Sequence, residues 1–154
     1  MGARLLWPAY GPELVINNTR SEPFGIYRIE RVPAVSMHRG DLVLFPVPDA
    51  FKQLVVQRGW LKPGQPMLKS IGALAGDQAC IDDRHVSING QVRGPVFQVD
   101  SFGERMPSLR GCFALGPGEF LPLSTYTDKS FDGRYIGAIP LSSVIGVARP
   151  VWTF

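Results

Sequence analysis

One lysine and two serines have the residue types and surroundings that nucleophilic chemistry needs. Lys69 interrupts the apolar stretch Met67–Leu74. If this stretch is a strand, alternate side chains share a face, and Lys69 lies with Met67, Ile71 and Ala73. Burial there would disfavour the ammonium form and lower the lysine pKa from about 10.4. A neutral amine can remove the proton of a serine hydroxyl. The alternative is a lysine whose ammonium group reaches water at a strand end.

The two candidate nucleophiles are Ser21 and Ser36. Ser21 precedes Pro23 and Gly25, which favour a turn in which a backbone N–H could point at a reacting carbonyl. The hydroxyl of Thr19 could serve the same oxyanion. Taken alone, this segment is also typical of an ordinary loop that enters a strand. Ser36 is followed by Met37 and lies just before the Gly-Asp that opens an apolar run.

A third polar group lies in Lys129–Gly137, where Ser130, Asp132 and Arg134 alternate with other residues. On a strand, Asp132 and Arg134 would share a face and could form an ion pair. The alternative interpretation is a surface turn with solvated charges.

The elements that must position these residues are mostly strands. The 17 Gly and 14 Pro leave little room for long helices. Asn89-Gly90 between alternating runs predicts a tight β-hairpin. The other predicted strands are Gly25–Val32, Asp41–Val47, Met67–Leu74, a pair within Gly111–Thr125 around Gly116–Gly118, and Ser142–Trp152.

One helix is expected within Pro48–Trp60. Asp49 would cap this helix and Gly59 would end it. Helical spacing would place Phe51, Leu54, Val55 and Arg58 on one face.

Composition restricts the function further. The chain of 154 residues is the size of one domain, and its net charge of +3 contains no like-charge run typical of nucleic-acid binding. No segment reaches the roughly 18 apolar residues of a transmembrane helix. Cys80 and Cys112 lack metal-ligand spacing, and His38 and His85 add little, so a zinc site has weak support. A disulfide and two separate buried thiols both remain open.

Five short motifs in order give the chain its resemblance to a family. It resembles the type I signal peptidases, and in particular their conjugative-transfer branch, the TraF-type peptidases of bacterial plasmids. The motifs are Ser21-x-Pro23-x-Gly25-x-Tyr27, Arg39-Gly40-Asp41-x-Val43, Leu68-Lys69 with Gly76-Asp77, Asn89-Gly90, and Ser130-Phe131-Asp132-x-Arg134-Tyr135-x-Gly137. Ser36 lacks the following Pro of the family pattern, which favours Ser21. Glu22 departs from the apolar residue often found after the serine.

The resemblance implies the fold and the cellular setting. It implies a mainly β, antiparallel signal-peptidase-type domain over residues 17–154, with a hairpin-bearing excursion at about 77–111 and one short helix. Residues 1–16 would be a juxtamembrane lead-in to a missing N-terminal anchor in the inner membrane, with the catalytic domain on the periplasmic face. This oxidising setting favours a Cys80–Cys112 disulfide across the excursion.

The resemblance also implies the roles of the site residues. Ser21 would attack the scissile carbonyl, and Lys69 would be the general base. The Ser21 N–H and Thr19 would stabilise the oxyanion, Ser130 would orient Lys69, and Asp132 with Arg134 would support that block. No metal, cofactor or nucleic acid is expected.

The expected substrate is a secreted precursor, such as the pilin of a conjugation or type IV secretion system, and some family members cyclise their product. A self-cleaving repressor-type peptidase is disfavoured because no DNA-binding helical segment is present. A non-catalytic assembly component of a secretion apparatus remains the alternative.

Overall fold

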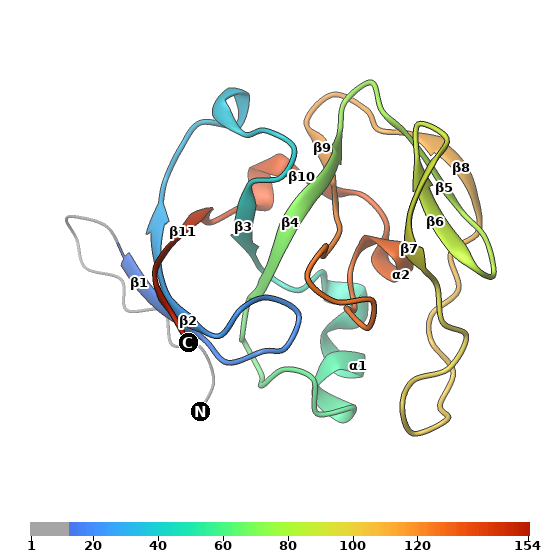
Figure 1. Cartoon of the computed structure of the whole chain (residues 1–154), viewed down its shortest axis with the longest axis horizontal. Coiled ribbons are helices and arrows are strands. Elements are labelled where there is room, and N and C mark those ends of the chain that lie inside the picture. Colours follow the sequence, from blue (N-terminus) through green and yellow to red (C-terminus); the bar gives the residue numbers. More distant parts are fainter. Residues whose placement is uncertain (1–12) are drawn as a thin grey trace.

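A computed structural model describes residues 13–154, which form two antiparallel β-sheets placed side by side (Figure 1). The larger sheet has the strand order β1-β2-β11-β3-β4-β9-β10, and the smaller has the order β7-β6-β5-β8. The larger sheet comprises β1 (Glu13–Asn17), β2 (Gly25–Glu30), β11 (Gly146–Thr153), β3 (Leu42–Phe45), β4 (Met67–Leu74), β9 (Glu119–Pro122) and β10 (Ile139–Pro140). The smaller comprises β7 (Gln91–Pro95), β6 (His85–Ile88), β5 (Gln78–Ile81) and β8 (Gly111–Ala114). The mainly β, antiparallel fold predicted from the sequence is confirmed.

Strand β4, which lies between β3 and β9, has one face buried throughout, as its sequence predicts. Met67, Lys69, Ile71 and Ala73 are all buried. Met67 and Ile71 belong to the main apolar core, together with Phe45 of the neighbouring strand β3. Lys69 therefore enters the protein interior from the middle of a sheet.

The helix predicted within Pro48–Trp60 is present but shorter. A 3₁₀ turn over Asp49–Phe51 leads into α1 (Lys52–Gln57), and Gly59 adopts a positive φ of 69° just beyond its end. The prediction that Asp49 caps the helix was wrong. Its carboxylate forms an ion pair with the Lys52 ammonium at 2.7 Å, because side chains three residues apart in sequence lie on the same side of a 3₁₀ turn.

Two strands predicted as a hairpin belong to different sheets. A turn at Gly116–Gly118 does reverse the chain, and Gly118 has a positive φ of 75°. However, β8 pairs with β5, whereas β9 pairs with β4 and β10. The turn residues specify only the reversal, and the pairing follows from partners far away in sequence.

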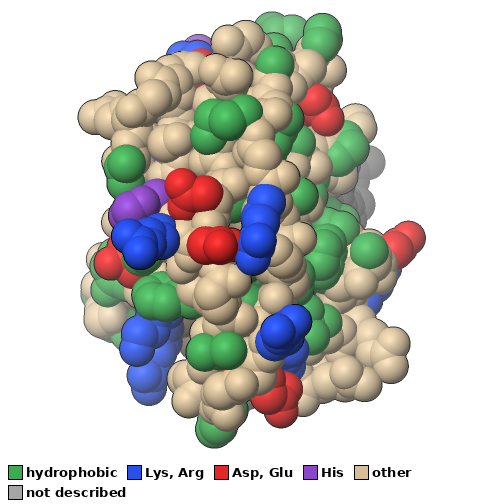
Figure 2. Space-filling view, turned by 90° about the vertical axis from the view of Figure 1, so that its right-hand side faces the viewer, with side chains coloured by type: hydrophobic (Ala, Val, Ile, Leu, Met, Phe, Trp, Pro, Cys, Tyr) green, Lys and Arg blue, Asp and Glu red, His purple; other side chains and the backbone are tan. Residues whose placement is uncertain are grey.

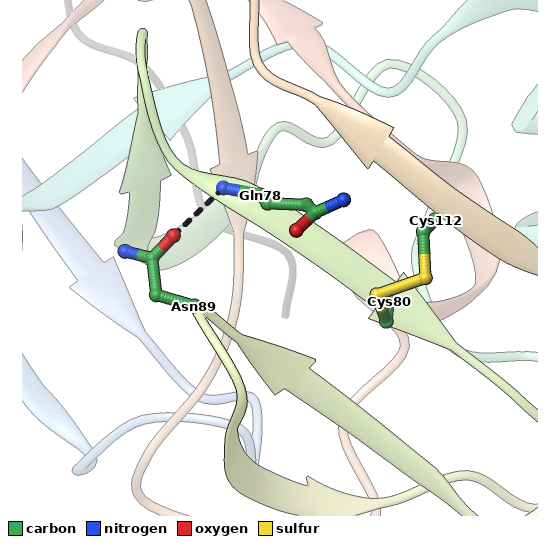
Figure 3. The surroundings of a disulfide bond; sticks show 4 residues. All are labelled: Gln78, Cys80, Asn89 and Cys112. Carbon is green, nitrogen blue, oxygen red and sulfur yellow. Dashed lines mark hydrogen bonds between the residues drawn. A yellow bond between two sulfur atoms is a disulfide. The ribbon is translucent and has the colours of Figure 1, made fainter.

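The smaller sheet contains the predicted hairpin and a disulfide. Asn89 and Gly90 have φ values of 51° and 81°, as a tight turn between β6 and β7 requires. Cys80 on β5 lies opposite Cys112 on β8, and their sulfurs are bonded (Figure 3). The cysteines that flank the excursion are thus joined directly across the sheet.

Three of the sequence motifs meet at the buried carboxylate of Asp77, between the two sheets. The Arg39 guanidinium donates to both of its oxygens at 2.5 and 2.6 Å, and the Asn89 amide donates at 2.9 Å. Asn89 also accepts from the Gln78 N–H at 2.9 Å (Figure 3). Hydrogen bonds from Arg39 are the main cause that lowers the Asp77 pKa. These motif residues therefore join the sheets and do not face the candidate nucleophile.

The Lys129–Gly137 block contains a helix, α2 (Gly133–Ile136), where the sequence suggested a strand. Asp132 is its N-cap and accepts from the Arg134 N–H and from the guanidinium, with Nε at 2.9 Å. Asp132 is 0% exposed and Arg134 is 1% exposed. A Cβ on Gly133 would lie 2.5 Å from the Pro122 carbonyl oxygen, so this turn has no space for a side chain. The predicted ion pair is present, with helix-cap geometry.

The outer side of the smaller sheet has a mixed surface. Figure 2 shows basic, acidic and apolar side chains interspersed over that side of the molecule, and neither charge sign dominates. Within residues 13–154, no helix has the length and apolar character that crossing a bilayer requires.

The disulfide should stabilise the excursion measurably. A Cys80→Ser/Cys112→Ser variant is expected to lose about 3 kcal/mol of unfolding free energy, because the bond closes a loop of 32 residues. Urea unfolding measures this loss, and the reduced native chain should match the double variant. Two alkylated thiols in the unreduced protein would contradict the pairing.

The buried ion pair should contribute more than an exposed one. Asp132→Ala leaves the Arg134 guanidinium uncompensated in the interior, so the free energy of unfolding should fall by about 3–5 kcal/mol. Asp49→Ala is the matched control, because its partner Lys52 is exposed, and it should cost less than about 1 kcal/mol. Equal losses for the two variants would show that burial does not determine the effect.

Candidate active site

The Ser21 loop joins β1 to β2 and is held by the buried side chain of Asn17. The Asn17 amide nitrogen lies 3.1–3.3 Å from three carbonyl oxygens of the loop, those of Thr19, Glu22 and Pro23. Asn17 Oδ1 accepts from the Thr19 N–H at 3.1 Å and from its hydroxyl at 2.7 Å. A single amide thus fixes both halves of the loop. The single hydroxyl proton of Thr19 is already donated within it.

Gly25 and Tyr27 fix the end of the loop. Gly25 has no positive φ and begins strand β2, so its role is not the turn that the sequence suggested. A Cβ there would lie 2.2 Å from the Trp152 carbonyl oxygen, so glycine is needed for the close approach of β2 to β11. The Tyr27 hydroxyl donates to the Pro23 carbonyl at 2.7 Å.

Lys69 is buried at the candidate site, with 5% of its surface exposed. Its ammonium group donates to the Ser130 hydroxyl at 3.0 Å. Burial lowers the pKa of Lys69 to about 8, partly opposed by the carboxylates of Asp132 and Glu22. A substantial fraction of the amine is therefore neutral at mildly alkaline pH, as a general base requires.

A cavity of about 1160 Å³ brings Ser21 and Lys69 together with Thr19. Within residues 13–154, the structure places no hydrogen bond between Ser21 and Lys69, whose amine is bonded to Ser130. Ser36 does not line this cavity. It lies in an exposed 3₁₀ turn, Ala34–Ser36, which follows strand β2 in the sequence.

The cavity has an apolar wall and several cations. Trp60, Leu61, Met67 and Phe131 contribute apolar surface. Besides Lys69, the basic residues that line it are Arg20, Lys62 and Lys129. A cavity of this size with a mixed apolar and basic lining is large enough to hold several side chains of a ligand.

The loop that follows β7 also contributes to the cavity. Phe97, Val99 and Asp100 line the cavity from this loop. Arg58, at the end of α1, anchors the loop through an ion pair with Asp100 at 3.1 Å. The Phe97 N–H also donates to the Tyr135 hydroxyl at 2.9 Å.

Ser124 is a site residue that the sequence did not indicate. Its hydroxyl donates to the Ser21 carbonyl at 2.7 Å, and its N–H donates to Asp132 Oδ2 at 2.9 Å. The Arg134 guanidinium donates back to the Ser124 carbonyl at 3.3 Å. Ser124 therefore connects the Ser21 loop to the buried ion pair. It lies in a loop of ordinary composition without a motif, so no local signal identifies it.

Glu22, next to Ser21, is buried and lies beside Lys69. Its Oε1 is buried and has no hydrogen-bond partner within residues 13–154. Burial and, more weakly, the Asp132 carboxylate raise the pKa of Glu22 to about 7, whereas the positive charge of Lys69 and the nearby Ser124 side chain lower it. Glu22 is not among the residues that line the cavity.

Comparison with known proteins places this arrangement in context. The chain is 37% identical over 147 residues to the conjugal transfer protein TraF of Agrobacterium fabrum, covering 90% of this chain and 82% of the relative. It is 33% identical over 166 residues to the plasmid transfer protein TraF of Escherichia coli, covering 99% and 92%. A signal peptidase I structure from Enterococcus faecalis aligns with a TM-score of 0.43 and 21% identity, over 77% of this chain and 97% of that one.

The family match extends over nearly the whole chain. The family described as "Signal peptidase, peptidase S26" matches residues 8–153, which include every residue of the candidate site. The chain therefore belongs to the signal peptidase family, peptidase family S26.

Proposed function

We propose that the protein is a serine endopeptidase in which Ser21 and Lys69 form a catalytic dyad. The observation that carries this proposal is the buried Lys69 amine, whose pKa is lowered to about 8, in the cavity that Ser21 also lines. Catalytic hydrogen bonds are often long in free enzymes and tighten only when substrate is bound. The Lys69–Ser130 bond is compatible with this, because Ser130 would hold the amine until Ser21 approaches.

The proposed reaction proceeds in two steps. Ser21 Oγ attacks the scissile carbonyl while neutral Lys69 takes the hydroxyl proton. The Ser21 N–H stabilises the oxyanion, together with the Thr19 hydroxyl once it exchanges its bond to Asn17. Lys69 then returns the proton to the leaving amine. An acyl-enzyme remains, and a nucleophile activated by Lys69 releases the product.

The supporting residues keep this geometry fixed. Ser130 orients the Lys69 amine, and Asp132 with Arg134 holds the segment that carries Ser130. Ser124 adds a direct connection from the same ion pair to the Ser21 backbone. The dyad partners thus have a common support, although they lie 48 residues apart in sequence.

The substrate that we propose is a secreted precursor, the pilin of a conjugation or type IV secretion system. The support is the likeness to two conjugal or plasmid transfer proteins over most of their length. The site that we propose for the reaction is the periplasmic face of the inner membrane. Water releases a linear product from the acyl-enzyme, whereas the N-terminal amine of the same chain releases a ring.

A single incubation tests the proposed substrate and shows whether water or the N-terminal amine releases the product from the acyl-enzyme. The protein is mixed with the pilin precursor of a conjugative plasmid, and the product masses are measured. A cyclic product is lighter than the linear one by one water. If the precursor stays intact while the protein is folded, the pilin assignment fails and a non-catalytic assembly role gains support.

The two serines should behave differently on substitution. Ser21→Ala is expected to abolish cleavage, because it removes the nucleophile. Ser36→Ala should retain most activity, because Ser36 lies outside the cavity. The rate of precursor cleavage measures both effects. An inactive Ser36→Ala enzyme would disprove the assignment of Ser21.

Activity should depend on the protonation of Lys69. Since the neutral amine is the active form, the rate should rise with pH through a midpoint near the Lys69 pKa of about 8. Lys69→Arg should be inactive across this range because a guanidinium stays protonated. Lys69→Met should also be inactive, with thermal stability at pH 7 no lower than that of the native chain, because the amine is poorly solvated. Normal cleavage by Lys69→Arg would exclude Lys69 as the base.

A further inference from the structure

The loop of residues 96–110, between β7 and β8, contains no helix or strand (yellow in Figure 1). Loops of about this length without secondary structure are uncommon in compact domains, and the ordered ones usually have a function. Ordering each loop residue costs conformational entropy, which the contacts of the loop must offset. The loop residues that line the cavity are Phe97, Val99, Asp100, Ser101 and Met106.

Arg58, at the C-terminal cap of α1, contacts this loop at several points. Its guanidinium pairs with the carboxylates of Asp100 at 3.1 Å and Glu104 at 3.3 Å. It also donates to the Arg105 carbonyl at 2.6 Å and lies 3.8 Å from the Met106 sulfur. Only 14% of the Arg58 side chain and 7% of the Asp100 side chain are exposed, so solvent and salt screen this ion pair weakly.

The same guanidinium also contacts the apolar wall of the cavity. It lies 5.4 Å from the centre of the Trp60 ring, within the range of a cation–π interaction. Within the loop, Asp100 accepts from the N–H groups of Phe102 and Glu104 at 2.9 and 3.0 Å. Arg58 is not among the residues that line the cavity. It can therefore act on a ligand only through the residues that it holds.

The surface that the loop offers to the cavity is mainly apolar. Phe97 is 39% exposed and Val99 is 48% exposed, and both line the cavity. The Asp100 carboxylate is already bonded to Arg58 and to two N–H groups of the loop. Apolar side chains gain free energy when a ligand removes them from water. The ligand group that fits beside Phe97 and Val99 is therefore an apolar side chain.

On the basis of the proposed peptidase function, we propose that the loop of residues 96–110 binds an apolar side chain of the substrate, and that Arg58 is the positioning residue that holds the loop in place. Phe97 and Val99 carry no group that can transfer a proton or form a bond with the substrate. Their contact contributes equally to the bound substrate and to the transition state, so its loss raises KM and leaves kcat unchanged.

The first test measures kcat and KM for two variants of the loop. The probe is the best-cleaved member of a library of internally quenched decapeptides. Val99→Ser should raise KM about tenfold, with kcat unchanged. Phe102→Ser is the matched control, because Phe102 is 84% exposed and does not line the cavity, and it should leave both constants unchanged. A KM that stays the same in Val99→Ser, or that rises equally in Phe102→Ser, would overturn the proposal.

The second test identifies the occupant of the loop surface. Each apolar side chain of the probe peptide is replaced by serine in turn. One replacement should raise KM about tenfold for the native chain but have little effect for Val99→Ser, because that variant has already lost the contact. A purely structural role of Val99 would not produce this coupling. If no position of the peptide shows it, the apolar occupant is excluded.

The third test concerns Arg58. Arg58→Lys keeps a cation beside Asp100 but loses the planar fork that also reaches the Arg105 carbonyl, whereas Arg58→Met loses both contacts. Both variants should raise KM with kcat unchanged, Met more than Lys, and amide exchange should become faster in residues 96–110 but not in β4. Arg149→Lys is the control, because its partner Glu30 is exposed, and it should change neither measurement. A native KM in both Arg58 variants would show that Arg58 does not position the binding surface.

Binding measured without cleavage distinguishes this proposal from that of the dyad. A fluorescein-labelled probe peptide is titrated with the Ser21→Ala chain, and its Kd is measured by anisotropy. If no peptide is cleaved, the tightest-binding member of the library serves as the probe. Adding Val99→Ser should raise the Kd about tenfold.

The two proposals can then fail separately. If the native chain cleaves no peptide but Val99→Ser weakens binding, the dyad proposal fails and the role of the loop stands. If the native chain cleaves the probe and Val99→Ser changes neither KM nor Kd, the role of the loop is overturned and the dyad stands. A chain that binds no peptide of the library overturns both.

Discussion

The buried ion pair between Asp132 and Arg134 is the interaction on which the candidate site depends. Both side chains are removed from water, so each charge needs the other and needs hydrogen bonds for its remaining polar atoms. Arg134 meets this need by donating to the carbonyls of Pro95, Asp128 and Ser124. Pro95 is the last residue of strand β7 in the smaller sheet, so the ion pair also connects the two sheets.

The same ion pair is connected by hydrogen bonds to the segments that hold both partners of the proposed dyad. On one side, Asp132 fixes Ser124, and Ser124 fixes the Ser21 carbonyl. On the other side, the segment of Asp132 carries Ser130, which holds the Lys69 amine. Two further ionisable side chains, those of Lys69 and Glu22, are buried near this ion pair, and removing them from water costs folding free energy. Their pKa values shift toward each other, to about 8 and about 7.

The sequence determined the features that depend on local patterns. Alternation in Met67–Leu74 gave the buried face on which Lys69 lies, because side chains alternate along any strand. Asn89-Gly90 specified a tight hairpin, because both residues must adopt a positive φ. The order of the motifs indicated the family and favoured Ser21 over Ser36 as the nucleophile.

Contacts between distant segments were decided only by the tertiary structure. Nothing local indicates that Ser124 supports Ser21, or that Arg39 and Asn89 converge on Asp77, because these contacts span 12 to 103 residues. The turn at Gly116–Gly118 could not specify that β8 and β9 belong to different sheets, since a turn fixes a reversal and not the pairing partners. The burial of Glu22 was also not predictable from the sequence. A carboxylate next to a serine is ordinary in an exposed loop, and only the tertiary structure buries this one.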